Sequence, residues 1–263
     1  MVRIDEKLCI GCGACVRDCI GNNIELAEGK ATIKNECFLC GHCVAICPSN
    51  AVAISEYDMN EVEEYDEASF SVAPDNMLHK IKFRRSIRNY KNDMVTQEVL
   101  EQLLNAGRFT ATAKNNQSSY FVFVQKEREA FKDLVWNEID KIKAPEGERL
   151  PNDVFPLVAF NRRRKVNPAD DFLFRNAPVV LFITSDWPLD AGLAAQNIEH
   201  MAVSMGLGAL YNGYLARFCD SNKEVKKWLG IEGQTIRGCM LLGYPKTHYF
   251  RTAPRKEANV IWK

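Results

Sequence analysis

Eight of the ten cysteines lie within residues 9–47, in two runs of four with the same spacing, C-x2-C-x2-C-x3-C. That spacing places three thiolates on one tight loop and a fourth just beyond it, the arrangement that holds the irons of a 4Fe-4S cubane. Metal ligation explains such clustering better than disulfide cross-linking does. The runs are Cys9, Cys12, Cys15 and Cys19, and then Cys37, Cys40, Cys43 and Cys47.

Both runs resemble those of two-cluster bacterial ferredoxins, in which the fourth cysteine of each run ligates the other cluster. One departure is Ile20, which stands where a proline usually follows the first run, whereas Pro48 follows the second. Zinc, the alternative metal, is held by four ligands in two separated pairs, which two identical runs do not supply. The resemblance implies one cluster on Cys9, Cys12, Cys15 and Cys47, and another on Cys37, Cys40, Cys43 and Cys19.

A second group of chemically capable residues is the segment 84–90, Arg-Arg-Ser-Ile-Arg-Asn-Tyr. Its cations and hydroxyl suit a phosphate and an electron-rich ring edge, although an arginine-rich segment can equally be solvated surface. The glycine-rich loops of dinucleotide and P-loop sites are absent from the sequence. A doubly wound nicotinamide site is therefore not expected.

Segment 84–90 is similar to the entry motif of the nitroreductase family of FMN enzymes. Three further segments follow in that family's order: the loop 112–117, the stretch 195–208 and the stretch 243–256. The resemblance covers about residues 80–258 and implies an intertwined homodimer with FMN at the interface.

Carried over by position, the resemblance assigns residues to each part of the flavin. Arg84, Arg85, Ser86 and Arg88 would hold the phosphate, the ribityl chain and the pyrimidine edge, and Arg255 and Lys256 would complete the phosphate site. Tyr211, Asn212 and Gly213 would lie at the reactive N5 edge and are the candidate catalytic residues. Thr112, Asn115 and Gln117 would come from the other subunit.

These sites must be positioned by two domains of different composition. Residues 1–56 carry the eight cysteines and little apolar sequence, so bound clusters must supply much of their stability. An acidic linker is expected over 57–76, and a nitroreductase-like α+β domain, with a central sheet flanked by helices, over 77–263. Proline-rich residues 144–168 are expected to form an irregular insertion, and Cys219 and Cys239 to pack in the core.

Local patterns predict the main elements of the second domain. Strands are expected over 120–125, 179–184 and 239–242. Helices are expected after an N-cap at Thr96, over 190–205, and after an N-cap at Ser221. A glycine turn is expected over 208–213.

Charge and hydropathy argue against nucleic acid and membranes as partners. Lys plus Arg and Asp plus Glu both number 34, so no net charge draws the chain to nucleic acid or to an anionic membrane. No apolar run is long enough to span a bilayer, and the N-terminus lacks a secretory signal, so a cytoplasmic location is expected.

Together these features predict an iron-sulfur flavoprotein oxidoreductase. Electrons would pass from a low-potential donor, such as a ferredoxin or flavodoxin, through two 4Fe-4S clusters to FMN and on to a nitroaromatic or quinone. Three alternatives stay open: an electron-transfer protein without substrate chemistry, a reductase of activated alkenes or a dehalogenating flavoenzyme, and an oxidase or dehydrogenase that passes electrons outward from substrate to ferredoxin.

Overall fold

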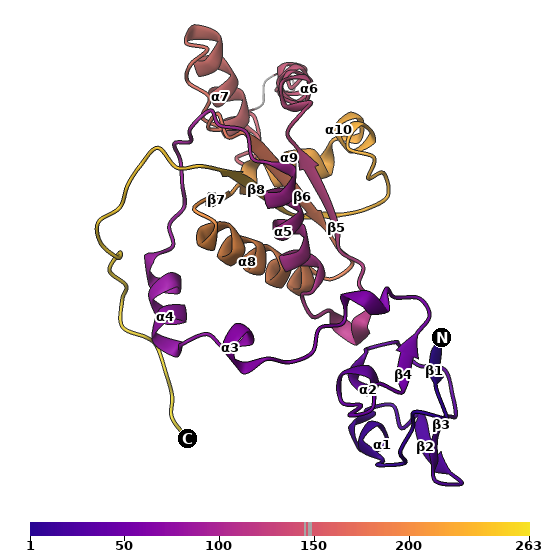
Figure 1. The fold of residues 1–263 in the computed structure, drawn as a ribbon. Helices are drawn as coiled ribbons and strands as arrows, with labels where there is room; N and C mark the ends of the chain where they lie inside the picture. Colours follow the sequence, from indigo (N-terminus) through magenta and orange to yellow (C-terminus); the bar gives the residue numbers. More distant parts are fainter. Residues whose placement is uncertain (145, 147–148) are drawn as a thin grey trace. The chain divides into compact units, whose positions relative to one another are not determined.

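The computed structural model describes residues 1–144, 146 and 149–263. It divides into two compact units, the first made of residues 1–71 and 112–116, the second of residues 72–111 and 117–263 (Figure 1). The predicted domain limits at 56 and 77 stay predictions. Pro145, one of the prolines of the expected insertion, lies outside the described residues. No helix among the described residues is long and apolar enough to cross a membrane.

The first unit is built from two short antiparallel pairs and two short helices. Its first pair joins the two ends of the cysteine region, and its second pair is a hairpin. Each helix begins directly after a glycine in the left-handed conformation, Gly13 or Gly41. The elements are β1 (Val2–Ile4), α1 (Ala14–Asp18), β2 (Ile24–Ala27), β3 (Lys30–Ile33), α2 (His42–Ala45) and β4 (Val52–Ile54).

The acidic segment after β4 is not featureless. It contains the short helices η1 (Met59–Glu61) and α3 (Glu67–Phe70). Asp58 and Asp66 cap them, their carboxylates accepting backbone N–H groups two and three residues on, at 3.0 Å in each case. Part of the acidic charge therefore serves local structure rather than solvation alone.

The second unit is a three-layer domain around a four-stranded antiparallel sheet of order β5-β6-β8-β7. The strands are β5 (Tyr120–Val124), β6 (Val179–Thr184), β7 (Gly208–Tyr211) and β8 (Ile236–Gly243). Central strand β6 is buried along its whole length, so its side chains enter the core alternately on both faces. Val180 and Phe182 join one core, whereas Val179, Leu181 and Ile183 join the other.

Helices cover both faces of this sheet (Figure 1). One face packs against α5 (Gln97–Arg108) and α8 (Pro188–Ser204). The other is covered by α6 (Arg128–Asp140), α7 (Phe155–Val166), α9 (Gly213–Ser221) and α10 (Lys223–Trp228). The remaining elements are α4 (Pro74–Phe83), which precedes segment 84–90, and the single turn η2 (Ala113–Asn115), which belongs to the first unit.

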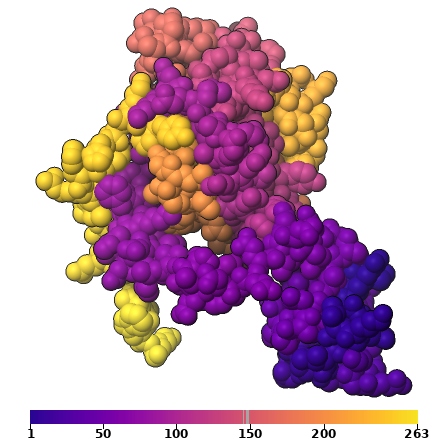
Figure 2. Space-filling model, in the orientation of Figure 1, coloured from indigo at the N-terminus to yellow at the C-terminus, as the bar shows by residue number. Residues whose placement is uncertain are grey.

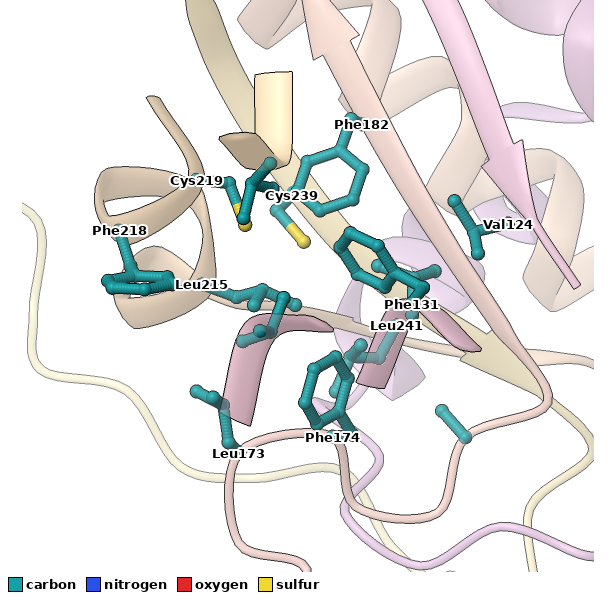
Figure 3. Close-up of a cluster of buried hydrophobic side chains, with 14 of the residues drawn as sticks. Val124, Phe131, Leu173, Phe174, Phe182, Leu215, Phe218, Cys219, Cys239 and Leu241 are labelled. Carbon is teal, nitrogen blue, oxygen red and sulfur yellow. The ribbon is translucent and has the colours of Figure 1, made fainter. Parts of the chain in front are cut away.

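The core under α9 contains both cysteines that lie outside the two runs. Cys219 and Cys239 are fully buried beside Phe182, Phe131 and Leu241 (Figure 3). Burial strongly raises the pKa of both thiols, so they stay protonated and unreactive. The prediction that they pack in the core is confirmed.

Three local predictions need correction. The glycine turn expected over 208–213 is strand β7 followed by the first residue of α9, because Gly208–Tyr211 pair with β8. Asn222, not Ser221, caps α10, its side chain accepting the Val225 N–H at 2.9 Å. Within the expected irregular insertion, residues 155–166 form helix α7, with Pro156 in its first turn where proline is tolerated.

Candidate cofactor sites

The eight run cysteines surround two separate cavities of the first unit, four to each. One cavity is lined by Cys19, Cys37, Cys40 and Cys43, and the other by Cys9, Cys12, Cys15 and Cys47. Each set contains three cysteines of one run and the last cysteine of the other, the division expected from the sequence. We call them the second-cluster and first-cluster cavities respectively.

The positions of the four thiols around each cavity indicate which metal group the cavity could hold. All eight cysteines are free of disulfides. In the described part of the chain, no three His, Cys, Asp or Glu side chains lie close enough to hold a single metal ion. Four thiols distributed around a cavity suit a cubane, which takes one thiolate at each of four irons, better than a lone zinc ion.

Backbone amides support both cavities. In the first-cluster cavity, Ala31 N–H donates to Cys9 Sγ at 3.4 Å and Ala51 N–H donates to Cys47 Sγ at 3.3 Å. In the second-cluster cavity, Asn23 N–H donates to Cys19 Sγ at 3.3 Å and Leu39 N–H to Cys37 Sγ at 3.4 Å. Such N–H···S bonds stabilise negative charge on a cluster and raise its reduction potential.

Gly11 shows how tightly the first cysteine loop is folded. Its φ is +69°, and a Cβ built there would lie 2.2 Å from the Gly29 carbonyl oxygen. Any other residue would therefore clash with the β2–β3 turn as well as being strained. The glycine between Cys9 and Cys12 is thus required by the fold of the loop.

The thiols differ in how readily they ionise. Burial raises the pKa of Cys43 to about 11, with a smaller contribution from the neighbouring Cys40. Burial also acts on Cys47, but hydrogen bonds from Ser49 and Ala51 outweigh it and lower the pKa of that thiol. Since only thiolates ligate iron, cluster assembly must release a proton from Cys43.

In the second unit, segment 84–90 is fixed by pairing with strand β7. Ile87 N–H donates to the Ala209 carbonyl at 2.9 Å. Tyr90 is buried, and its hydroxyl donates to the carbonyls of Ile87 and Leu241, each at 3.0 Å. A Cβ at Gly208 would lie 2.1 Å from the Ile87 side chain, so this close approach requires glycine.

This pairing brings predicted flavin contacts from two segments into one cavity. Arg88 lines it together with Tyr211, Asn212 and Gly213, at the point where β7 ends and α9 begins. The cavity volume is about 380 Å³, within the usual range for ligand pockets of roughly 300–1,000 Å³. The sequence did not predict five of the other lining residues, Phe160, Arg175, Leu210, Tyr214 and Arg217. Phe172 and Leu173 complete the lining.

The cavity is cationic and aromatic. In the described part of the chain, Arg88, Arg175 and Arg217 form no ion pair. Desolvation, with a smaller contribution from Arg88, lowers the pKa of Arg175. Its guanidinium lies 3.7 Å from the centroid of Phe172, which also lines the cavity. A planar anionic group would satisfy these cations.

Tyr211 and Asn212 have distinct roles at the cavity. Asn212 is buried and caps α9, accepting the Leu215 N–H at 3.0 Å, while its amide donates to the Leu173 carbonyl at 2.6 Å. Burial, reinforced by Glu199, raises the pKa of Tyr211. Tyr211 therefore keeps its phenolic proton at neutral pH.

Arg84 and Arg85 have partners within the unit. Arg84 forms an ion pair of 3.0 Å with Glu199, which is only 1% exposed. Arg85 donates to the Arg84 carbonyl at 2.6 Å and to the Arg251 carbonyl at 3.4 Å. Glu199 lies on α8, within the family-like stretch 195–208, but no role was predicted for it from the sequence.

The remaining predicted flavin contacts lie elsewhere. Ser86 is partly buried and bridges to Ala209 of β7. Arg255 and Lys256 are exposed on the C-terminal segment. Thr112 and Asn115 belong to the first unit, whereas Gln117 belongs to the second. These assignments stay predictions.

The fold and the cavities define a class of protein, an FMN-dependent oxidoreductase carrying an iron-sulfur domain. Residues 81–244 match the model of the nitroreductase family, and residues 8–52 match that of the 4Fe-4S dicluster domain. The chain belongs to the nitroreductase family.

Solved structures support the fold of the second domain. A nitroreductase with bound FMN from Bacteroides fragilis aligns with a TM-score of 0.56 at 19% identity, over 71% of this chain and 98% of that one. Another, from Desulfitobacterium hafniense and also with bound FMN, gives a TM-score of 0.53 at 22% identity, over 70% and 97%. A relative from Archaeoglobus fulgidus, whose name proposes an NADH dehydrogenase or NAD(P)H nitroreductase activity, is 29% identical over 64% of this chain and 85% of its own.

Proposed function

We propose that this chain passes electrons from a low-potential donor through two 4Fe-4S clusters to FMN and on to a small organic acceptor, such as a nitroaromatic or quinone. The observation that carries the proposal is the division of eight cysteines, four and four, around two cavities in a chain of the nitroreductase family. Two 4Fe-4S clusters store and pass single electrons, so a second centre must do the two-electron chemistry.

The volume of the cavity beside β7 and its three arginines, Arg88, Arg175 and Arg217, support its assignment as part of the flavin site. Bound FMN would supply the conversion between one-electron and two-electron transfer. Arg88 and Arg175 would stabilise the negative charge that a reduced ring carries. Tyr211, protonated at neutral pH, would orient an acceptor or donate a proton to it.

We also propose a homodimer formed through the second domain. Its C-terminal segment extends away from the sheet and its helices (Figure 1) and is seen as yellow atoms at the surface in Figure 2. It exposes large apolar side chains, with Phe250 83% and Trp262 89% exposed. Helix α4 adds an exposed apolar set, including Leu78 and Ile81. Surfaces of this kind are usually covered by a partner. A second copy would also bring its loop 112–117 to complete the flavin site.

The test is cofactor analysis of protein purified without oxygen, followed by stepwise reduction and a screen of acceptors. About eight irons and eight sulfides per chain are expected, the content of two 4Fe-4S clusters, with one FMN. Cys12→Ser and Cys40→Ser should each abolish one cluster and leave the other. Iron without flavin would contradict the reductase assignment and leave an electron carrier. Reduction of the clusters by a candidate substrate, without any donor, would reverse the direction of electron flow.

A further inference from the structure

One side chain from the middle of the sequence contacts a cysteine loop of the first unit. Asn115 lies in segment 112–116, which the fold places in that unit. Its amide Nδ2 donates to the carbonyls of Phe38 and Leu39, each at 3.0 Å, and to the Tyr57 hydroxyl at 3.2 Å. Phe38 and Leu39 are the two residues between Cys37 and Cys40. Those two cysteines line the second-cluster cavity.

These bonds fix the Phe38–Leu39 and Leu39–Cys40 peptide groups. In a trans peptide group the N–H points in the opposite direction from the carbonyl. Holding the Phe38 carbonyl on Asn115 directs the Leu39 N–H to Cys37 Sγ, which it reaches at 3.4 Å. The Leu39 carbonyl is likewise held, which directs the Cys40 N–H away from Asn115. In the first-cluster loop, Lys30 donates to the Cys9 carbonyl and Arg17 to the Cys12 carbonyl. Among the described residues, no side chain donates to the carbonyls of the two residues between those cysteines, Ile10 and Gly11.

The loop needs support because its backbone is strained. Leu39 has φ of +53°, a left-handed conformation that a branched side chain such as leucine rarely adopts. Such a conformation persists only where the surroundings over-determine it. Asn115 is itself left-handed, with φ of +54°, which asparagine tolerates well.

We infer that Asn115 is a positioning residue of the second cluster: by holding the Phe38 and Leu39 carbonyls, it keeps the loop amides on the cluster and so raises that cluster's reduction potential. The inference rests on the proposed function in that it requires the clusters. It adds to that function a residue that sets the potential of one cluster, because the cluster accepts an electron from the low-potential donor more easily when these amides face its sulfurs. Gln117, two residues further on, is a predicted flavin contact, so one segment carries residues for both redox centres.

The test is a redox titration of the whole chain followed by electron paramagnetic resonance. Asn115→Gly removes the donors without adding charge or strain, since glycine accepts the left-handed conformation. Asn22→Gly is the matched control: Asn22 is exposed and left-handed, with φ of +50°, and follows Cys19 of the same cavity. In the described part of the chain, its side chain makes no hydrogen bond. Cys40→Ser identifies the signal of the second cluster.

At the wild-type midpoint, Asn115→Gly should lower the ratio of reduced to oxidised second cluster about tenfold, which corresponds to 59 mV for one electron. The first cluster and the Asn22→Gly control should be unchanged. Asn115→Asp keeps the shape but replaces the donors with a negative charge, so it should lower the reduction potential of the second cluster at least as much as Asn115→Gly does. An unshifted second cluster in Asn115→Gly, or a normal potential in Asn115→Asp, would overturn the inference. Absence of clusters from the wild-type protein would instead count against the proposed function.

Discussion

At the residue scale, Gly208 packs so closely against Ile87 that no side chain fits between them. The hydrogen atom at Gly208 lets segment 84–90 lie directly against β7, which places Arg88 beside Tyr211 in one cavity. A single methyl group at this position would separate the two halves of the predicted flavin site. The same position therefore matters for folding and for cofactor binding.

Gly208→Ala should destabilise the second domain by about 1–3 kcal/mol, the usual cost of overpacking a well-packed core. It should also lower FMN content, because the added Cβ would lie 2.1 Å from the Ile87 side chain. Thermal melting and flavin analysis measure the two effects. Gly192→Ala on α8 is the control, since a Cβ there meets nothing within 4 Å and alanine favours the helix. Equal effects of the two substitutions would contradict the steric argument.

The ion pair of Arg84 with Glu199 gives a second residue-scale prediction. Arg84→Gln leaves a carboxylate with 1% exposure without its cation and should cost about 3 kcal/mol. Glu199→Gln should cost less, because Arg84 is 25% exposed and can be solvated. Denaturant unfolding measures both, and the double variant should be less destabilised than the sum of the single variants.

Measurements of FMN affinity distinguish the two roles of Arg84, the ion pair with Glu199 and the predicted contact with the FMN phosphate. If it contacts the FMN phosphate, as the resemblance predicts, Arg84→Gln should weaken FMN binding about tenfold or more, since a lost charge-assisted bond is worth roughly 1.5–3 kcal/mol. Glu199→Gln keeps the cation and should bind FMN with nearly unchanged affinity. Fluorescence titration with FMN gives both dissociation constants. The reverse order of affinities would assign Arg84 to structure alone.

At the element scale, the long buried elements could be predicted from the sequence and the short paired ones could not. Strand β6 was predicted with both ends correct, because six consecutive apolar or β-branched residues leave little choice. Strand β7 was missed because its first residue, Gly208, and the flanking Asn212 and Gly213 are typical of turns. Only pairing with β8 makes it a strand, and local sequence does not contain that information.

The candidate sites likewise combine features that the sequence predicts with features that only the fold reveals. The four-and-four sharing of the cysteines is what the resemblance to two-cluster ferredoxins implies, and the two cavities are lined by those two sets. Arg175 and Arg217 were missed, since each lies outside the motifs and reaches the cavity only through the fold. Asn115 was predicted to contact the flavin. Its contacts with Phe38 and Leu39 join residues 77 and 76 positions apart in the sequence, which no local pattern predicts.

The thin core of the cysteine region leads to an element-scale prediction. Apart from Cys9 and Cys15, its buried apolar side chains are few and aliphatic: Val2, Ile24, Ala31, Ala51, Val52 and Ile54. Iron removal by a chelator, without oxygen and with reductant, should therefore unfold residues 1–56, because cluster binding is part of their folding free energy. Hydrogen exchange should show lost protection in β1–β4 while β6 and β8 stay protected. Retained protection throughout would show that the strands are stable without metal.

At the scale of the whole molecule, the C-terminal segment of the second domain exposes large apolar side chains that a single chain leaves in contact with water. Residues 247–263 contain no helix or strand and expose Phe250, Ile261 and Trp262 by 83%, 83% and 89%. Burying such side chains stabilises by about 1.5–3 kcal/mol each, enough to hold a segment on a partner. The segment also carries Arg255 and Lys256, so assembly and flavin binding are predicted to depend on it together.

Deletion of residues 250–263 should therefore convert a dimer into a monomer and lower FMN affinity at least about tenfold, the effect of losing roughly 1.4 kcal/mol of binding energy. Analytical ultracentrifugation and FMN titration measure the two changes. The full-length Arg255→Gln/Lys256→Gln variant separates them, because it removes the predicted phosphate contacts but keeps all the apolar side chains. It should bind FMN weakly yet remain dimeric. A truncated chain that stays dimeric would place the interface elsewhere, with exposed Leu78 and Ile81 of α4 the next residues to substitute.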